Sequence, residues 1–305
     1  MQGVRATPRL DVVDAFPAFE EFWQKVRGEP VALQVDRWEH EYMAPWPELL
    51  AKQQRSYRSD RVDWRRVART RVFPLLEGRL ERMRSLHRDL RRTLPVSWAR
   101  AQKILRIRFP VRFVIHVGIG CGAWATTYEG RAACLLGLEN PAENHRGGDG
   151  WSRSVVAHEV AHLAHQAWRG ERWEQRADPW WTLYEEGFAT YCERLIEPGR
   201  YPLRTGAPDW LRWCEDRRPW LARRFLHDVA GRRSLRPFFG SWYKIQGHIE
   251  TGYYLGAEMI RTWTAHSSLR AVAVLPRSEI HRRARATLRE FAEGRSSAPR
   301  GARPE

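Results

Sequence analysis

Long apolar segments are missing from the sequence. The 305 residues contain no run of about 18 consecutive apolar residues, which is the length needed to cross a membrane. The first 14 residues contain no basic segment followed by an apolar block, so they give no sign of a secretory signal. We therefore expect a cytoplasmic protein that has no membrane partner.

Paired cysteines are also missing. The four cysteines form no CxxC pair, which argues against a zinc knuckle and against a disulfide framework. We expect reduced thiols, as in a cytosolic protein. The four residues are Cys121, Cys134, Cys192 and Cys214.

Lysine is scarce, although the chain is strongly basic. Only four of the 52 Lys and Arg residues are lysines, and the net charge is +16. A basic chain of this kind is typical of nucleic-acid-binding proteins. No nucleic-acid-binding motif accompanies the charge, however, and arginines spread over solvated helix faces account for it more simply. We therefore do not expect nucleic acid as the partner.

Hydrophobic patterning predicts an α+β fold that is mainly helical. The expected N-terminal helices span 14–57 (several short helices), 72–93 and 96–107. Three short, β-branched segments then predict a small antiparallel sheet, namely 111–117, 123–129 and 131–138. The glycine-rich run 118–122 lacks the spacing of a dinucleotide-binding loop, and we expect a hairpin turn there. Further helices are expected over 151–169, 180–196, 207–230, 249–266 and 277–293.

An HExxH motif lies in the first helix after the predicted sheet. His158 and His162 are four residues apart, so both imidazoles lie on one face of a helix and can bind one Zn²⁺. Glu159 is offset by one residue and can accept a proton from a metal-bound water. Apolar residues surround the motif, which predicts a buried helix with only its metal face open.

A second helix offers a third zinc ligand. Glu186 lies 24 residues after His162, and Gly187 follows it directly. We expect Gly187 to let this helix approach the HExxH helix closely, so that Glu186 reaches the metal. Glu193 lies two turns further along the same face and could accept a hydrogen bond from the free ring nitrogen of a zinc-binding histidine. Glu185 is the alternative to Glu186 as the third ligand.

These motifs together resemble a known family. HEVAH followed by EEGFATYCE is similar to the gluzincin metallopeptidases, and most similar to a bacterial family of predicted zinc-dependent proteases whose members also carry GYxxG, here residues 252–256. The resemblance covers roughly residues 110–265. It implies a zincin-like catalytic domain over 111–293, after an N-terminal helical region (1–110). It also implies His158, His162 and Glu186 as ligands of one Zn²⁺ and Glu159 as the general base. The tail (294–305) is polar and contains Gly and Pro, so we expect it to be disordered.

The resemblance also suggests a residue that stabilises the transition state. Gluzincins place a Tyr or His donor over the developing oxyanion, and by the GYxxG motif Tyr253 is the candidate here, with core packing as the alternative role. Three other groups stay minor. His165 is expected to be structural or to support a zinc ligand, His248 could donate to a substrate, and Gly137–Asn140 faintly resembles the strand with which aminopeptidases hold a free amino terminus.

The sequence therefore predicts a zinc-dependent peptidase whose partner is a peptide or protein substrate. The strand at 131–138 is expected, by the resemblance, to align an extended substrate through main-chain hydrogen bonds. The competing prediction is a non-catalytic, zinc-stabilised protein whose basic surface binds nucleic acid or an acidic partner. Glu159 argues against it, because a structural zinc site needs no general base. Endopeptidase and aminopeptidase activity both remain open.

Overall fold

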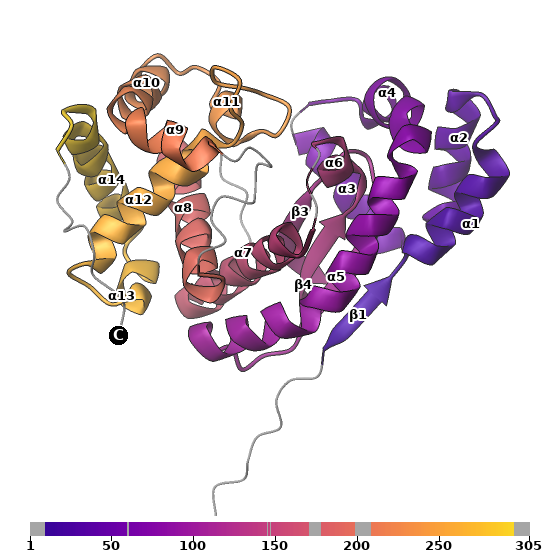
Figure 1. Ribbon diagram of the computed structural model, residues 1–305, viewed down its shortest axis with the longest axis horizontal. Helices are drawn as coiled ribbons and strands as arrows, with labels where there is room; N and C mark the ends of the chain where they lie inside the picture. The colour runs from indigo at the N-terminus through magenta and orange to yellow at the C-terminus, as the bar shows by residue number, and fades with distance from the viewer. Residues whose placement is uncertain are drawn as a thin grey trace, which may run out of the picture. The chain divides into compact units, whose positions relative to one another are not determined.

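The structure is a computed structural model that describes residues 10–59, 61–144, 146, 148–170, 178–198 and 209–295. The chain divides into two compact units, Met1–Glu159 and Val160–Glu305, and the boundary falls inside helix α7 (Gly148–Arg169). Most of the chain is helical, as the α+β prediction requires (Figure 1). All but the first two residues of the tail expected at 294–305 lie outside the described residues.

The four-stranded sheet of the first unit is mixed, so the prediction of an antiparallel sheet is wrong. The order is β1-β2-β4-β3, in which β1, β2 and β4 run parallel and only β3 is antiparallel. Strand β1 is short and lies in the region where we expected only helices. The strands are β1 (Asp11–Asp14), β2 (Val111–His116), β3 (Ala123–Tyr128) and β4 (Arg131–Gly137).

Strand β4 lies between β2 and β3, and this changes two of our expectations. Residues 118–122 do not form a hairpin turn, because β2 and β3 are not neighbours. The true hairpin joins β3 to β4, and both of its loop residues have positive φ (Glu129, 48°; Gly130, 72°), as a type I′ turn requires. Because β4 is paired on both sides, it cannot align a substrate through its main chain; the edge strands of the sheet are β1 and β3.

Most helices of the first unit lie in the predicted regions, but three short ones, which begin at Trp64, Ala68 and Glu139, lie in segments where no helix was expected. The expected helices 72–93 and 96–107 are one helix, α5 (Leu76–Leu105), which continues through Pro95. Proline removes one helix hydrogen bond. The helix nevertheless continues because Leu90, Leu94 and Trp98 on both sides of it are buried. The other helices are α1 (Phe16–Val26), α2 (Val31–Arg37), η1 (Trp38–Tyr42), α3 (Pro47–Ser59), α4 (Trp64–Val67), η2 (Ala68–Val72), η3 (Phe73–Leu75) and α6 (Glu139–Glu143).

Helix α5 and the first half of α7 cover one face of the sheet (Figure 1). The Trp98 ring of α5 packs edge-on against Phe113 of β2, with 5.7 Å between centroids. The register partner of Phe113 on β4 is Cys134, and the charge of Glu159 on α7 acts on this thiol. Residues in register point to the same face of a parallel sheet, so the sheet supports the helix that carries HExxH.

The second unit is helical and built around α8 and α12. Gly187 does allow a close approach of two helices, but its partner is Gly256 of α12 and not, as we predicted, the HExxH helix: a Cβ on Gly187 would lie 2.3 Å from the Gly256 carbonyl carbon. The helix expected at 207–230 is two helices, α9 and α10, separated at Arg217 just before Pro219. The helices are α8 (Pro179–Ile196), α9 (Trp210–Asp216), α10 (Arg218–Ala230), α11 (Arg236–Phe239), α12 (Thr251–Thr264), α13 (Leu269–Ala273) and α14 (Arg277–Ala292).

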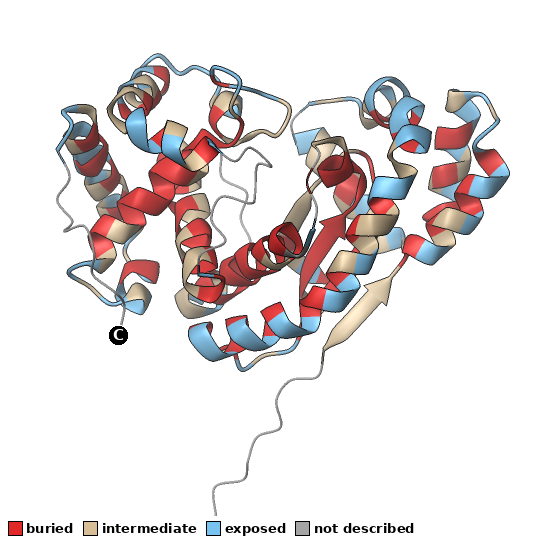
Figure 2. Cartoon of the chain, viewed as in Figure 1, coloured by how far each residue is buried: buried red, intermediate tan, exposed pale blue. Residues whose placement is uncertain are grey.

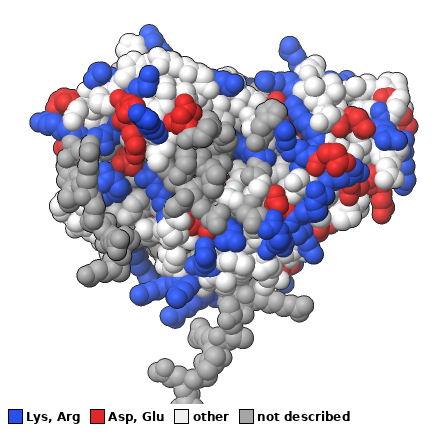
Figure 3. All heavy atoms as spheres, viewed as in Figure 1, with Lys and Arg blue, Asp and Glu red and all other residues white. Residues whose placement is uncertain are grey.

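The surface carries the basic charge, and the interior holds the apolar residues. Figure 2 shows buried residues concentrated along α7, α8, α12 and the sheet. Figure 3 shows Lys and Arg in several groups on the displayed face, with Asp and Glu between them. Many of the arginines form ion pairs, such as Arg84 with Glu20 and Arg37 with Glu29. In the described parts of the chain, no helix has the length and apolar character of a membrane span.

Candidate metal centre

Helix α7 holds the HExxH motif in the interior, as predicted. His158 is 1% exposed, Glu159 4% and His162 8%. The neighbouring Val156 and Val160 are fully buried, which anchors the helix in the core. Both imidazoles are therefore largely shielded from solvent, and water would screen the attraction between a bound cation and its ligands only weakly.

Helix α8 begins at a well-defined cap that precedes Glu186 by two turns. The Asp178 carboxylate accepts hydrogen bonds from the backbone N–H of Trp180 and of Trp181, at 3.0 and 3.4 Å. Pro179 occupies the first helical position, which suits its fixed φ. Arg277 also donates to this carboxylate, with Nη2 at 2.9 Å. The start of α8 is therefore fixed by its cap and by α14.

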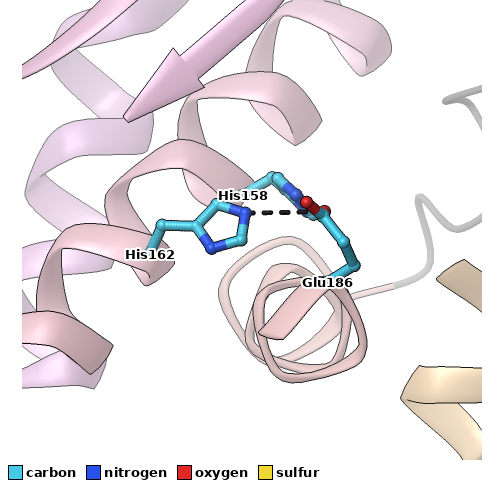
Figure 4. A group of neighbouring side chains, drawn as sticks. All are labelled: His158, His162 and Glu186. Atoms are coloured by element: carbon cyan, nitrogen blue, oxygen red, sulfur yellow. Dashed lines mark ion pairs between the residues drawn. The ribbon is translucent and has the colours of Figure 1, made fainter. Parts of the chain in front are cut away.

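The structure brings the three predicted ligands together. One ligand atom each of His158, His162 and Glu186 lies within 4.8 Å of the other two, and Glu186 Oε2 is 3.5 Å from His162 Nε2 (Figure 4). Helix geometry alone sets His158 one turn from His162, because α7 is continuous between them. Ligands at about 2.0–2.2 Å from a tetrahedral zinc lie about 3.4 Å apart. Two imidazoles and one carboxylate at these separations could hold a metal ion such as Zn²⁺, and among the described residues no fourth protein ligand belongs to the group.

Glu186, rather than Glu185, belongs to this group. Glu185 instead accepts a hydrogen bond from the Trp181 side chain. Burial raises the pKa of Glu185, with a further contribution from the negative charge of Glu186, while His162 acts in the opposite direction. Among the residues that the structure describes, Glu185 is in no cluster with metal-ligand spacing.

Glu159, the predicted base, lies close enough to β4 for its charge to act on the Cys134 thiol. The pKa of the Cys134 thiol is well above its usual range because the thiol is buried and because Glu159 is nearby. Cys134 is therefore an unreactive thiol at neutral pH. All four cysteines are free, in keeping with the absence of a disulfide framework.

Tyr253 lies outside the group of three ligands. It is half-buried in the first turn of α12, and its ring packs edge-on against Phe239, with 5.8 Å between centroids. Its neighbour Tyr254 is 1% exposed and packs against Trp210. The two glycines of GYxxG serve packing: a Cβ on Gly252 would clash with Phe239 at 2.6 Å, and Gly256 meets α8.

Glu193 and His165 are both buried in the second unit, near the ligand-bearing parts of α7 and α8. Glu193 lies two turns after Glu186 on the same side of α8, and its predicted bond to a zinc-binding histidine stays a prediction. His165 Nε2 lies 2.9 Å from the Tyr184 hydroxyl, a bond that sequence reasoning did not find. Burial lowers the pKa of His165 to about 3, so its imidazole is neutral.

The remaining candidates are held by other interactions. His248 stacks on Trp213 with 4.1 Å between centroids, and its Nδ1 lies 3.0 Å from the Gln246 carbonyl. In the Gly137–Asn140 segment, Glu139 Oε1 accepts from Gly120 N at 2.9 Å and Asn140 Nδ2 donates to the Gly120 carbonyl at 3.0 Å. This segment therefore anchors the glycine-rich loop.

A second group with metal-ligand spacing lies on the surface of the first unit. Asp36, Glu39 and His40 are close together at the end of α2 and in η1, but Asp36 and His40 are exposed. Arg65 forms ion pairs with both Asp36 and Glu39. An arginine already compensates these carboxylates, so we assign no site to them.

The chain was compared with known proteins at three levels. No family model, no curated protein and no solved structure matches it. The residues of the site itself therefore provide the argument for function.

Proposed function

We propose that the protein is a zinc-dependent hydrolase that cleaves peptide bonds, of the gluzincin type. The observation that supports this most strongly is the convergence of His158, His162 and Glu186 on one point, from two helices. A structural zinc site fills its fourth position with a protein ligand, whereas a hydrolytic site leaves it open. A carboxylate, Glu159, stands next to the first histidine, where a hydrolase needs a base.

The proposed mechanism assigns one role to each residue. His158, His162 and Glu186 hold one Zn²⁺. The ion, when bound, supplies a water of lowered pKa and a positive charge beside the substrate carbonyl. Glu159 accepts the proton of the attacking water and delivers it to the leaving amine, so that the elements of water are added across the C–N bond. Tyr253 donates a hydrogen bond to the carbonyl oxygen as its negative charge develops.

The substrate, in this proposal, is an extended peptide or protein segment. Strand β3 supports this, because it is the edge strand next to β4 and its Ala125 is in register with Cys134, the residue near Glu159. An extended peptide can add to such an edge through main-chain hydrogen bonds. Recognition by the main chain would make cleavage tolerant of side-chain identity.

The experiment that tests the function combines metal analysis with proteolysis. Purified protein is expected to contain about one zinc per chain and to cleave an unfolded protein such as reduced, alkylated casein. A chelator should abolish cleavage, and added Zn²⁺ should restore it. A zinc-loaded protein that cleaves nothing, and that shifts DNA or an acidic protein in a salt-dependent manner, would instead favour the non-catalytic alternative.

A further inference from the structure

A hydrogen-bonded pair, His165 and Tyr184, joins the two helices that carry zinc ligands. The distance from His165 Nε2 to the Tyr184 hydroxyl is 2.9 Å, and the side chains are 2% and 0% exposed. His165 lies three residues after His162 on α7, and Tyr184 lies two residues before Glu186 on α8. The bond therefore forms within one turn of the ligand on each helix.

The direction of this bond follows from the other partners of Tyr184. The tyrosine hydroxyl donates to the backbone carbonyls of Val272 and Ala273, at 2.9 and 3.1 Å. A hydroxyl has a single proton, so toward His165 it acts as the acceptor. When the hydroxyl proton points to one of these carbonyls, His165 carries its proton on Nε2 and donates it to Tyr184.

A third element, the end of α13, completes the connection. Arg169, one turn after His165 on α7, donates from Nη1 to the carbonyls of Ala273 and Leu275 at 2.7 and 2.9 Å. Its guanidinium also lies over the Trp181 ring of α8, 4.9 Å from the centroid. Helices α7 and α8 are thus bonded to each other and to the same backbone segment.

From these contacts we infer that His165 and Tyr184 are positioning residues for the metal site. They fix the separation and rotation of α7 and α8 so that Glu186 reaches the ion held by His162. The inference rests on the proposed function, because it assumes that the three ligands bind zinc. A site of this kind tolerates displacements of only about 0.5 Å, and residues that orient ligands typically change metal affinity by about 10–100-fold.

Two kinds of substitution test this inference. Tyr184→Phe keeps the ring and its packing but removes the hydroxyl. His165→Gln keeps an N–H donor at about the position of Nε2, whereas His165→Leu removes it. Tyr128→Phe is the matched control, since Tyr128 is equally buried but lies on β3. The measurements are zinc affinity by chelator competition, the visible spectrum of the Co²⁺-substituted protein, and the thermal unfolding temperature.

We expect Tyr184→Phe and His165→Leu to weaken zinc binding about tenfold or more and to alter the Co²⁺ spectrum. His165→Gln should restore much of the affinity, and Tyr128→Phe should leave it unchanged. Wild-type affinity and spectrum in folded Tyr184→Phe would overturn the inference while leaving the proposed function intact. If Tyr184→Phe does not fold, equal affinities of His165→Gln and His165→Leu would overturn it. A wild-type protein that binds no zinc would overturn both proposals.

Discussion

Gly187 and Gly256 are in direct backbone contact where α8 crosses α12. A Cβ on Gly256 would lie 2.3 Å from the Leu183 carbonyl oxygen and 2.7 Å from the Gly187 Cα, so neither position has room for a side chain. Gly187 follows the zinc-ligand candidate Glu186 directly. The place of the Glu186 carboxylate in space therefore depends on how closely α8 packs against α12.

The first prediction concerns this crossing. Gly187→Ala should lower the free energy of unfolding by about 1–3 kcal/mol or more, because the new methyl group must push two helix backbones apart. Urea denaturation measures the change. Gly78→Ala in α5 is the control, since nothing lies within 4 Å of its added Cβ, and alanine there should stabilise the helix by up to about 1 kcal/mol. Equal effects of the two substitutions would contradict the prediction.

The second prediction concerns the general base. Glu159→Gln should lower kcat for peptide hydrolysis by about 10²–10⁴-fold, since the amide cannot accept the proton of the attacking water. Zinc content should remain near one per chain, because Glu159 is not a ligand. Rates on an unfolded protein substrate and metal analysis of the same sample measure both. Glu215→Gln, an exposed position on α9, should change neither. Full activity of Glu159→Gln would exclude the mechanism.

The third prediction separates the two neighbouring glutamates of α8. Glu186→Ala should reduce the zinc stoichiometry after dialysis, because it removes one of the three proposed protein ligands. Glu185→Ala should retain zinc, because Glu185 is hydrogen-bonded to Trp181 and does not belong to the group formed by His158, His162 and Glu186. Metal analysis at equal protein concentration compares them. Loss of zinc only in Glu185→Ala would reverse the assignment.

The fourth prediction tests Tyr253. Tyr253→Phe should lower kcat by about 10²–10³-fold without affecting zinc content, as expected for the loss of one donor to the oxyanion. Tyr254→Phe is the neighbouring control, since Tyr254 packs into the core against Trp210. An unchanged kcat in Tyr253→Phe would leave this residue with its packing role against Phe239.

Local features of the chain were predictable from its sequence, and long-range features were not. The spacing of His158 and His162 places them on one helix face whatever the fold is, because that face is a property of the helix itself. The position of β4 between β2 and β3 depends on contacts between distant segments, which strand patterns do not encode. The helices expected at 72–93 and 96–107 are one, because burial on both sides of Pro95 overrides the lost hydrogen bond.

Within the site, the same distinction holds. Glu186 could be predicted because it directly precedes Gly187 in the second helix. Glu159 could be predicted because it follows His158 in the HExxH motif. The partner of Gly187 could not be predicted, because α12 follows α8 by more than fifty residues in the chain. The His165–Tyr184 bond was equally inaccessible, since a buried histidine and a buried tyrosine carry no pairing signal in a single sequence.

The last prediction concerns Glu139, whose carboxyl group is fully buried beneath the glycine-rich loop. Burial raises its pKa to about 7 from 4.5, although hydrogen bonds from Gly118 and Gly120 act in the opposite direction. Between these pH values the folded chain holds a proton that the unfolded chain has released. The free energy of unfolding should therefore fall as the pH rises from about 4.5 to about 7, by up to about 3 kcal/mol, and then level off.

Glu139→Gln removes this titration and should remove that part of the pH dependence. The variant should gain stability relative to wild type as the pH rises from 4.5 to 8, because an amide keeps an acceptor for the Gly120 N–H and carries no charge. Urea unfolding curves at several pH values measure the difference. Glu21→Gln on the exposed side of α1 is the control and should leave the wild-type slope unchanged. Parallel profiles for wild type and Glu139→Gln would mean that the buried carboxyl group keeps an ordinary pKa.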